Sequence, residues 1–146
     1  MKKHVWYVLV SCILLLLSAC AIQSGTQATA SLTDTYWRVT QVGGQAVDHG
    51  DFTREPHLVL HSDQSRVSGT TGCNNLLGQF DQQGPQLDFS KLGSTRMMCT
   101  QSTMKVEAAM LQALGDTDNY DIQGNQLTFY NAQHQPVAQF QAIAMD

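Results

Sequence analysis

Basic residues are scarce in this sequence, and their scarcity argues against one class of function. The 146 residues include 8 Lys and Arg against 12 Asp and Glu. Lys2 and Lys3 stand at the N-terminus, so residues 20–146 keep six basic and all 12 acidic side chains, a net charge of −6. Nucleic-acid binding draws on a basic stripe that neutralises phosphates. The composition therefore predicts no nucleic-acid partner and no polybasic attachment to lipid headgroups.

The sequence also lacks an apolar run long enough to cross a membrane. The longest, residues 5–17, falls short of the roughly 20 residues that a spanning helix needs. It follows Lys2 and Lys3 and leads into Leu-Ser-Ala-Cys at residues 17–20. A charged region, an apolar region and a small-residue cleavage site in this order are typical of an export signal. Residues 1–19 are therefore predicted to be a signal peptide that is removed.

The Leu-Ser-Ala-Cys sequence resembles the lipobox of bacterial lipoproteins, whose peptidases cleave before a cysteine that carries a diacylglycerol thioether. The resemblance implies that Cys20 is acylated, with an ordinary thiol as the alternative, and that the lipid attaches the protein to a membrane. Ala21 stands where Asp favours retention at the inner membrane, which implies the periplasmic face of the outer membrane. Residues 20–32 are small and polar, so they are predicted to be the lipidated N-terminus and a flexible tether.

Residues 33–146 are predicted to form a single domain, which is mainly β. Short segments with alternating apolar residues, separated by turn residues, indicate antiparallel strands. Trp37 and Val39 share one face of the first segment, and Leu58 and Leu60 share one face of the second. The strands are expected at residues 36–42, 57–61, 66–69, 78–81, 86–89, 120–123, 126–130 and 136–142.

One helix interrupts the strand pattern, at residues 104–114. Its expected buried stripe consists of Met104, Ala108, Leu111 and Leu114, which recur at helical spacing. Thr100 or Ser102 is expected to cap its start and Gly115 to end it, since these residue types favour the two helix ends.

Two cysteines, Cys73 and Cys99, remain once Cys12 is removed with the signal and Cys20 takes the lipid. An isolated pair in an oxidising compartment usually forms a disulfide. The two lie 26 residues apart, for which the chain-entropy model gives about 3.5 kcal/mol of stabilisation. Two separate buried thiols are the alternative. A redox-active pair is less favoured, because the CxxC spacing that lowers a thiol pKa is absent.

The residues around these cysteines resemble those of a known family, the META domain. The first part is residues 67–75, Val-Ser-Gly-Thr-Thr-Gly-Cys-Asn-Asn, and the second is residues 94–99, Ser-Thr-Arg-Met-Met-Cys, leading into a helix with Glu107. The resemblance is closest to the HslJ-type lipoproteins and covers about residues 33–142. Its motif residues are Gly72, Cys73, Asn74, Ser94, Thr95, Arg96, Met97 and Met98.

The resemblance carries expectations about fold and function. It implies a compact antiparallel, β-barrel-like sheet with one α-helix. It also implies an association with heat shock and with tolerance of the antibiotic novobiocin. It implies no catalytic residue, because none is established for the family, and no cofactor.

The residues that could bind a metal are poorly placed for it. His57 and His61 would stand about 13 Å apart on a strand, at about 3.3 Å per residue, so they cannot share an ion. Asp48, His49 and Asp51 lie in a loop, where polar residues are the rule. No GxSxG elbow is present, and Gly69 and Gly72 are expected to serve a bulge or a tight turn rather than a phosphate. We therefore predict neither a metal site nor a catalytic site.

Arg96 is expected to be a buried charge, because it stands beside two methionines. It would need a carboxylate partner, for which Glu107 and Asp88 are the candidates. The methionines are expected to fill the core between helix and sheet, in preference to forming a box for a hydrophobic ligand. They are Met97, Met98, Met104 and Met110.

Three functions are compatible with these features. The favoured one is a non-enzymatic outer-membrane lipoprotein that supports envelope integrity under stress by contacting another envelope component. The alternative is a carrier or pilot lipoprotein that holds an acyl chain or a hydrophobic peptide in its barrel. An enzyme is the least favoured, since it would need titratable groups that converge in a cleft.

Overall fold

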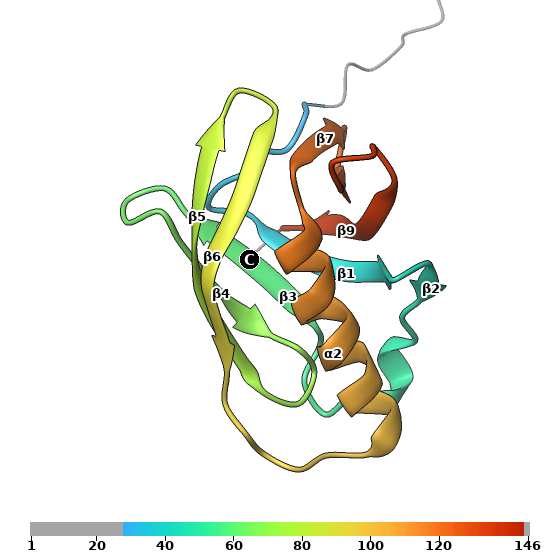
Figure 1. Ribbon diagram of the computed structural model, residues 1–146. Helices are drawn as coiled ribbons and strands as arrows, with labels where there is room; N and C mark the ends of the chain where they lie inside the picture. The colour runs from blue at the N-terminus through green and yellow to red at the C-terminus, as the bar shows by residue number, and fades with distance from the viewer. Residues whose placement is uncertain (1–27, 145–146) are drawn as a thin grey trace, which may run out of the picture.

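The structure, a computed structural model, describes residues 28–144 (Figure 1). The predicted signal peptide, Cys20 and residues 21–27 of the predicted tether lie outside the described residues. Within this range one α-helix, α2 (Gln101–Asp116), and one short 3-10 helix, η1 (His49–Asp51), accompany nine strands. The strands are β1 (Tyr36–Val42), β2 (Gln45–Ala46), β3 (His57–His61), β4 (Arg66–Thr70), β5 (Asn75–Gln83), β6 (Gln86–Ser94), β7 (Asn119–Gln123), β8 (Gln126–Tyr130) and β9 (Pro136–Ile143).

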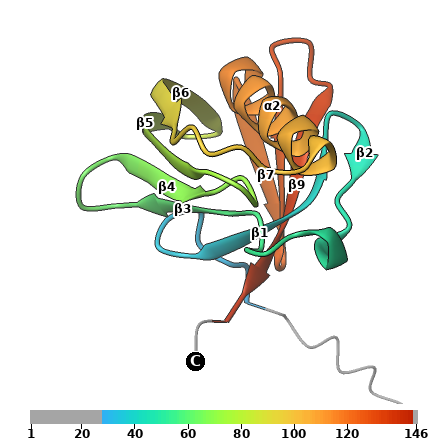
Figure 2. The ribbon, with the colours of Figure 1, turned by 90° about the horizontal axis from the view of Figure 1, so that it is seen from below.

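The strands form one antiparallel sheet that closes on itself. Apart from the short β2, which pairs with β1 from the outside, each strand pairs with its neighbour along the chain, and β9 returns to pair with β1. The ring is weakest between β6 and β7, where a single pair, Gln86 with Asn119, joins the two strands. Helix α2 lies at this place and packs on β6, β9 and β1 (Figure 2). The predicted fold class, a mainly β barrel-like sheet with one helix, is confirmed.

Apolar side chains fill the inside of the ring. Alternate residues of the strands point inward, and Trp37, Phe129 and Phe140 are the largest of those that are fully buried. The indole Nε1 of Trp37 donates to the carbonyl of Leu32 at 2.9 Å, which satisfies the one polar atom of that side chain. This filled interior counts against the alternative of an acyl chain carried inside the barrel.

Two residues that the sequence places in the tether pack against the domain. The backbone N–H of Ala30 donates to the carbonyl of Gly124, in the turn between β7 and β8, at 2.9 Å. The side chain of Leu32 is buried in the core. The folded domain therefore includes residues that the composition alone assigns to the tether.

Helix α2 is longer than predicted and buries a different stripe. It begins after Thr100, whose Oγ1 accepts from the N–H of Thr103, as expected for one of the two candidate caps. Gly115 lies inside its last turn, and Thr117 caps the end. The buried face carries Thr103, Glu107, Met110, Ala113 and Leu114, so only Leu114 of the predicted stripe is fully buried. A hydrophobic pattern could not reveal this face, because a carboxylate lies at its centre.

The strand bounds agree with the prediction for β1, β3 and β8 and differ most for β5 and β6. These two strands extend to Asn75 and Ser94, well beyond the predicted segments at residues 78–81 and 86–89. The alternation is interrupted in these parts, because Leu76 and Leu77 are consecutive apolar residues and the β5–β6 register shifts between Leu77 and Gln79. Their extension brings the two parts of the sequence motif side by side.

Candidate functional site

The two parts of the motif meet at one end of the barrel. The first part, residues 67–75, includes the turn between β4 and β5. The second part, residues 94–99, begins at the last residue of β6 and continues into residues 95–100, here called the motif loop, which joins β6 to α2. Cys73 and Cys99 are bonded, with 6.0 Å between their Cα atoms, so the predicted disulfide is confirmed. The bond fixes the far end of the motif loop to the turn.

Asn74 fixes the near end of the motif loop. Its side chain is 1% exposed, and its Oδ1 accepts from the N–H of Met97 at 2.7 Å and from Oγ1 of Thr95 at 2.9 Å. Its Nδ2 donates to Oε2 of Glu107 at 2.8 Å and to the carbonyl of Met97 at 3.3 Å. One buried amide therefore links the turn, the motif loop and the helix.

Glu107 supplies the charge at the centre of this network. Its carboxylate accepts from Oγ1 of Thr71 at 2.8 Å, from Nδ2 of Asn74 at 2.8 Å and from Oγ of Ser94 at 3.0 Å. No Lys or Arg of the described part of the chain forms an ion pair with it. Hydrogen bonds from neutral donors thus take the place of a cation, as buried charges require.

The prediction of a buried Arg96 is wrong. Arg96 is exposed on the motif loop, and it is the candidate partner, Glu107, that is buried. The reason is geometric: the motif loop runs over the end of the barrel and directs Arg96 to solvent, whereas Glu107 lies on the helix face that covers the sheet.

Most of the methionines are also misplaced by the prediction. Met98 is 99% exposed, Met97 52% and Met104 39%, and only Met110 lies in the core. The backbone N–H of Met97 donates to the side chain of Asn74, and Cys99 is bonded to Cys73. The motif loop is therefore fixed at both ends with apolar side chains directed to solvent.

Glycine at position 72 is required by the turn. Gly72 has a φ of +91°, and a Cβ there would overlap the side chain of Phe52 and lie 3.1 Å from Pro56. Gly69, in β4, has a different reason: a Cβ would overlap the carbonyl of His57 on the neighbouring strand. The expected tight turn is present at Gly72, and Gly69 permits a close approach of β4 to β3.

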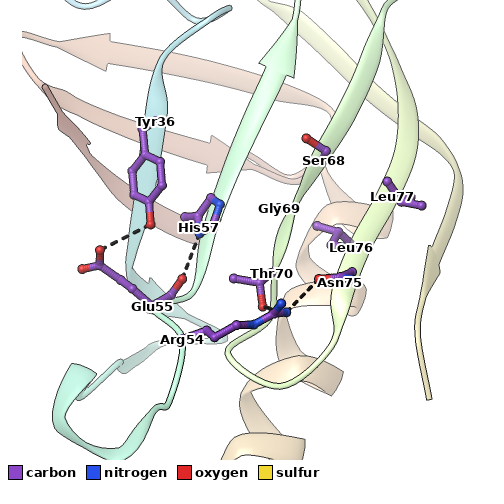
Figure 3. Close-up of a pocket in the computed structure, with 10 residues that line it drawn as sticks. All are labelled: Tyr36, Arg54, Glu55, His57, Ser68, Gly69, Thr70, Asn75, Leu76 and Leu77. Carbon is purple, nitrogen blue, oxygen red and sulfur yellow. Dashed lines mark hydrogen bonds between the residues drawn. The ribbon is translucent and has the colours of Figure 1, made fainter. Parts of the chain in front are cut away.

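A groove on the outer face of the barrel adjoins the motif. It encloses about 450 Å³ and crosses β1, β3, β4 and β5 (Figure 3). We call it the outer groove. The rings of Tyr36 and His57 stack at one side, with centroids 4.2 Å apart, and Leu77, 55% exposed, lies at the other. The lining residues are Tyr36, Arg54, Glu55, His57, Ser68, Gly69, Thr70, Asn75, Leu76 and Leu77.

Arg54 lies at the end of the outer groove nearest the motif. Its Nη2 donates to Oγ1 of Thr70 at 2.7 Å and to Oδ1 of Asn75 at 2.8 Å. Figure 3 shows its side chain extending across the end of the groove to reach these two strands. The guanidinium therefore brings a positive charge to the rim of the groove.

A second hollow, of about 660 Å³, lies near β7 and carries the opposite charge. Asp118, Asp121, Tyr130 and His134 are among its lining residues. None of the motif residues lines it. We therefore take the outer groove and the motif loop, and not this hollow, as the candidate site.

Glu55 sets the electrostatics of the aromatic side of the outer groove. Its carboxylate lies 3.4 Å from the hydroxyl of Tyr36 and 3.4 Å from Nη1 of Arg38. Burial raises the pKa of Tyr36 above its ordinary value of 10.0, and the negative charge of Glu55 and its hydrogen bond with the phenol raise the pKa further. The charge of Arg38 opposes this shift.

An alkaline titration should detect this environment. Because the folded pKa of Tyr36 is raised, the protein should lose stability as the pH rises above about 10, where an unfolded tyrosine ionises. Followed by ultraviolet absorbance of the phenolate, the ionisation step of Tyr36 should be absent in Tyr36→Phe and should move to lower pH in Glu55→Gln. A Glu55→Gln titration identical to that of the parent would contradict the assigned cause.

The other candidate ligands are dispersed. Nδ1 of His57 lies 2.9 Å from the carbonyl of Glu55, and Nε2 of His61 lies 2.7 Å from Oγ of Ser68. Asp48 accepts from the N–H of Gly50 at 3.0 Å, and His49 lies 3.8 Å from Glu55. The backbone of Asp51 lies in η1. Among the described side chains, no three His, Cys, Asp or Glu residues come together as a metal site would require.

Sequence reasoning missed Tyr36, Arg54 and Leu77 as site residues. A usable signal was present for Leu77, because Leu76 and Leu77 are consecutive in a strand and one of them must point outward. Arg54 gave no such signal, since it lies in an irregular segment whose position depends on the whole fold.

Of the helices in residues 28–144, none has the length and apolar character of a membrane span.

A family model identifies the family of this chain, and solved structures support its fold. The family model of the META domain matches residues 30–144, which include the sheet, the helix and the whole motif. An NMR structure of a protein from Burkholderia xenovorans is similar, with a TM-score of 0.64, 28% sequence identity, and coverage of 78% of this chain and 85% of that one. A second NMR structure has a TM-score of 0.58 at 22% identity and covers 73% of this chain and 87% of its own, so it supports the fold alone. No curated protein gives a significant match. The chain belongs to the META domain family.

Proposed function

We propose that this protein is a lipid-anchored, non-enzymatic component of the bacterial envelope, of the HslJ type, that supports tolerance of stress such as novobiocin by binding a partner. The observation that carries the proposal is that the motif has a buried polar part and an exposed part. Its buried polar side chains bond one another, whereas Arg96, Met97 and Met98 are exposed on a loop fixed at both ends.

The buried part of the motif supports a structural role for its polar groups. The carboxylate of Glu107 accepts from three donors, and the amide of Asn74 takes part in four hydrogen bonds. A general base must have a free position within hydrogen-bond reach of a substrate proton. These groups are instead committed to joining three segments of the chain, so their chemistry serves the shape of the site.

The exposed part of the motif favours binding. Patches of exposed apolar residues on a soluble domain commonly mark sites of interaction, and methionine adapts well to the shape of a partner. In Figure 1 the described chain begins near β7, and the motif loop lies at the opposite end of the barrel. The hydrogen bond from Ala30 to the carbonyl of Gly124, in the β7–β8 turn, holds the start of the described chain there. A lipid at Cys20 would thus be linked to the barrel at the end opposite the motif.

Lipidation of Cys20 can be tested with a matched control in the same leader. Labelled palmitate should be incorporated into the parent and into Cys12→Ala, whose cysteine lies in the predicted signal peptide, but not into Cys20→Ala. Cys20→Ala should also accumulate as uncleaved precursor, and it should fail to restore novobiocin tolerance to a strain that lacks the gene. Labelling of Cys20→Ala equal to that of the parent would overturn the anchor. Full tolerance with unlabelled Cys20→Ala would show that the anchor is not needed for function.

A further inference from the structure

We infer that the motif loop and the outer groove form one docking surface, and that its occupant is an extended, acidic and apolar segment of another envelope protein. The inference rests on the proposed function, since it names the partner's chemistry at the site through which the protein would bind. It is carried by the continuity, the apolar character and the charge of this surface.

The strand register makes the groove and the loop continuous. His57, Thr70 and Asn75 are cross-strand neighbours on the outer face of β3, β4 and β5. Asn75 and Thr95 then exchange two hydrogen bonds, from each backbone N–H to the other residue, at 3.0 and 3.1 Å. The next outward row contains Leu77, whose cross-strand partner is Gly93 and therefore has no side chain to cover it. An extended segment could follow these rows from the aromatic stack to Arg96.

The surface concentrates the exposed apolar side chains of the domain. In residues 28–144 the exposed large hydrophobic residues are Leu77, Met97, Met98 and Met104, which lie on β5, on the motif loop and in the first turn of α2. Removing such a side chain from water on binding is favourable. Because the disulfide and Asn74 fix the motif loop, the methionines are not free to fold back into the core, and a partner is the remaining way to cover them.

The charge of the surface selects an acidic occupant. Arg54 lines the outer groove, Arg96 lies on the motif loop and Lys105 lies in the first two turns of α2, and Glu55, the acidic lining residue of the groove, is paired with Arg38. Exposed acidic residues occur toward the other end, where Asp81 faces Asp88 across the β5–β6 hairpin and Asp121 lies on β7. In a domain with an acidic balance the basic side chains around the motif favour an acidic segment at this end.

A second copy of the chain is a poorer occupant than a different protein. A symmetric pair would bring Arg96 and Lys105 of both copies together, with like charges opposed. A head-to-tail pair would offer the acidic end, but the exposed large hydrophobic residues of the described chain all lie at the motif end. The bilayer that holds the anchor is also disfavoured, because the motif loop and the start of the described chain lie at opposite ends of the barrel in Figure 1.

The test uses the lipidated protein in detergent and two fluorescent synthetic peptides, one alternating Leu and Glu and the other alternating Leu and Lys. Fluorescence anisotropy should show binding of the Leu/Glu peptide and no binding of the Leu/Lys peptide. Met98→Gln and Arg96→Glu should each weaken binding about tenfold, which corresponds to about 1.4 kcal/mol. Arg66→Glu, which reverses an exposed arginine at the β3–β4 hairpin, should leave the affinity within about twofold.

Three results would overturn the inference: equal binding of both peptides, affinity unchanged by Met98→Gln and Arg96→Glu, or binding to phosphatidylglycerol vesicles or to a second copy in place of the peptide. Circular dichroism melts of the variants separate lost contacts from lost folding. In cells, novobiocin tolerance kept by Met98→Gln and Arg96→Glu but lost by Cys20→Ala would reject this surface and leave the proposed function standing. Loss in all three variants, at normal abundance, would support both.

Discussion

Replacing Asn74 by alanine should lower the free energy of unfolding by about 3 kcal/mol, whereas replacing its neighbour Asn75 should lower it by less than about 1 kcal/mol. Asn74 is 1% exposed, and its loss leaves the N–H of Met97 without an acceptor and leaves Oε2 of Glu107 with one donor, Thr71, in place of two. Each buried group left unsatisfied costs about 1–3 kcal/mol. The side chain of Asn75 points outward and accepts from Arg54, so water can replace that bond.

Chemical denaturation of the two variants measures this difference directly. Asn74→Ala should also speed amide hydrogen exchange across residues 95–100, because the near end of the motif loop is released. Asn75→Ala should leave this exchange unchanged. Equal stability losses in the two variants would mean that the buried network does not hold the loop.

Removal of the disulfide should cost about as much as the loss of Asn74. The bond closes a loop of 26 residues, for which the chain-entropy model gives about 3.5 kcal/mol. Cys73→Ala/Cys99→Ala should therefore melt roughly 10–20 °C below the parent, given a few degrees for each kcal/mol in a domain of this size. Alanine is the appropriate replacement, because Cys73 is buried and a serine hydroxyl there would need a partner.

Reduction of the disulfide in the parent protein tests its stabilising effect independently of the substitutions. The parent should fall to the melting temperature of the double variant when reduced, and the double variant should not respond. A parent whose melting temperature is unaffected by complete reduction, verified by thiol labelling, would contradict the stabilising role. A reductant effect on the double variant would show that the measurement reports something other than this bond.

The sheet was more predictable than the site that it carries. Alternation of apolar residues predicts β1, β3 and β8 to the residue, because turn residues bound each of them closely. The cysteine pair follows from elimination and compartment. The bounds of β5 and β6 do not follow, since Leu76 and Leu77 are consecutive apolar residues and a register shift between the two strands interrupts the period of two.

The candidate site could not be predicted from local sequence patterns. Arg96 and Glu107 are both charged residues near apolar ones, and only the path of the motif loop over the barrel decides that Glu107 is the buried member. The same path leaves Met97 and Met98 exposed, against the usual preference of methionine. The outer groove combines β1, β3, β4 and β5 with residues 54–55, and sequence spacing alone cannot place these side chains around one hollow.

We propose that the motif acts by shaping a binding surface. The most direct test of this claim is Glu107→Gln. The amide oxygen can accept from Thr71 and Asn74, and its NH₂ can donate to Oγ of Ser94, so the network survives without the charge. A carboxylate that acted as an acid or base would lose that ability. We expect Glu107→Gln to lower the stability by about 1 kcal/mol or less and to restore novobiocin tolerance to within about twofold of the parent. Loss of tolerance with unchanged abundance and melting temperature would contradict the account and identify Glu107 as a chemical participant.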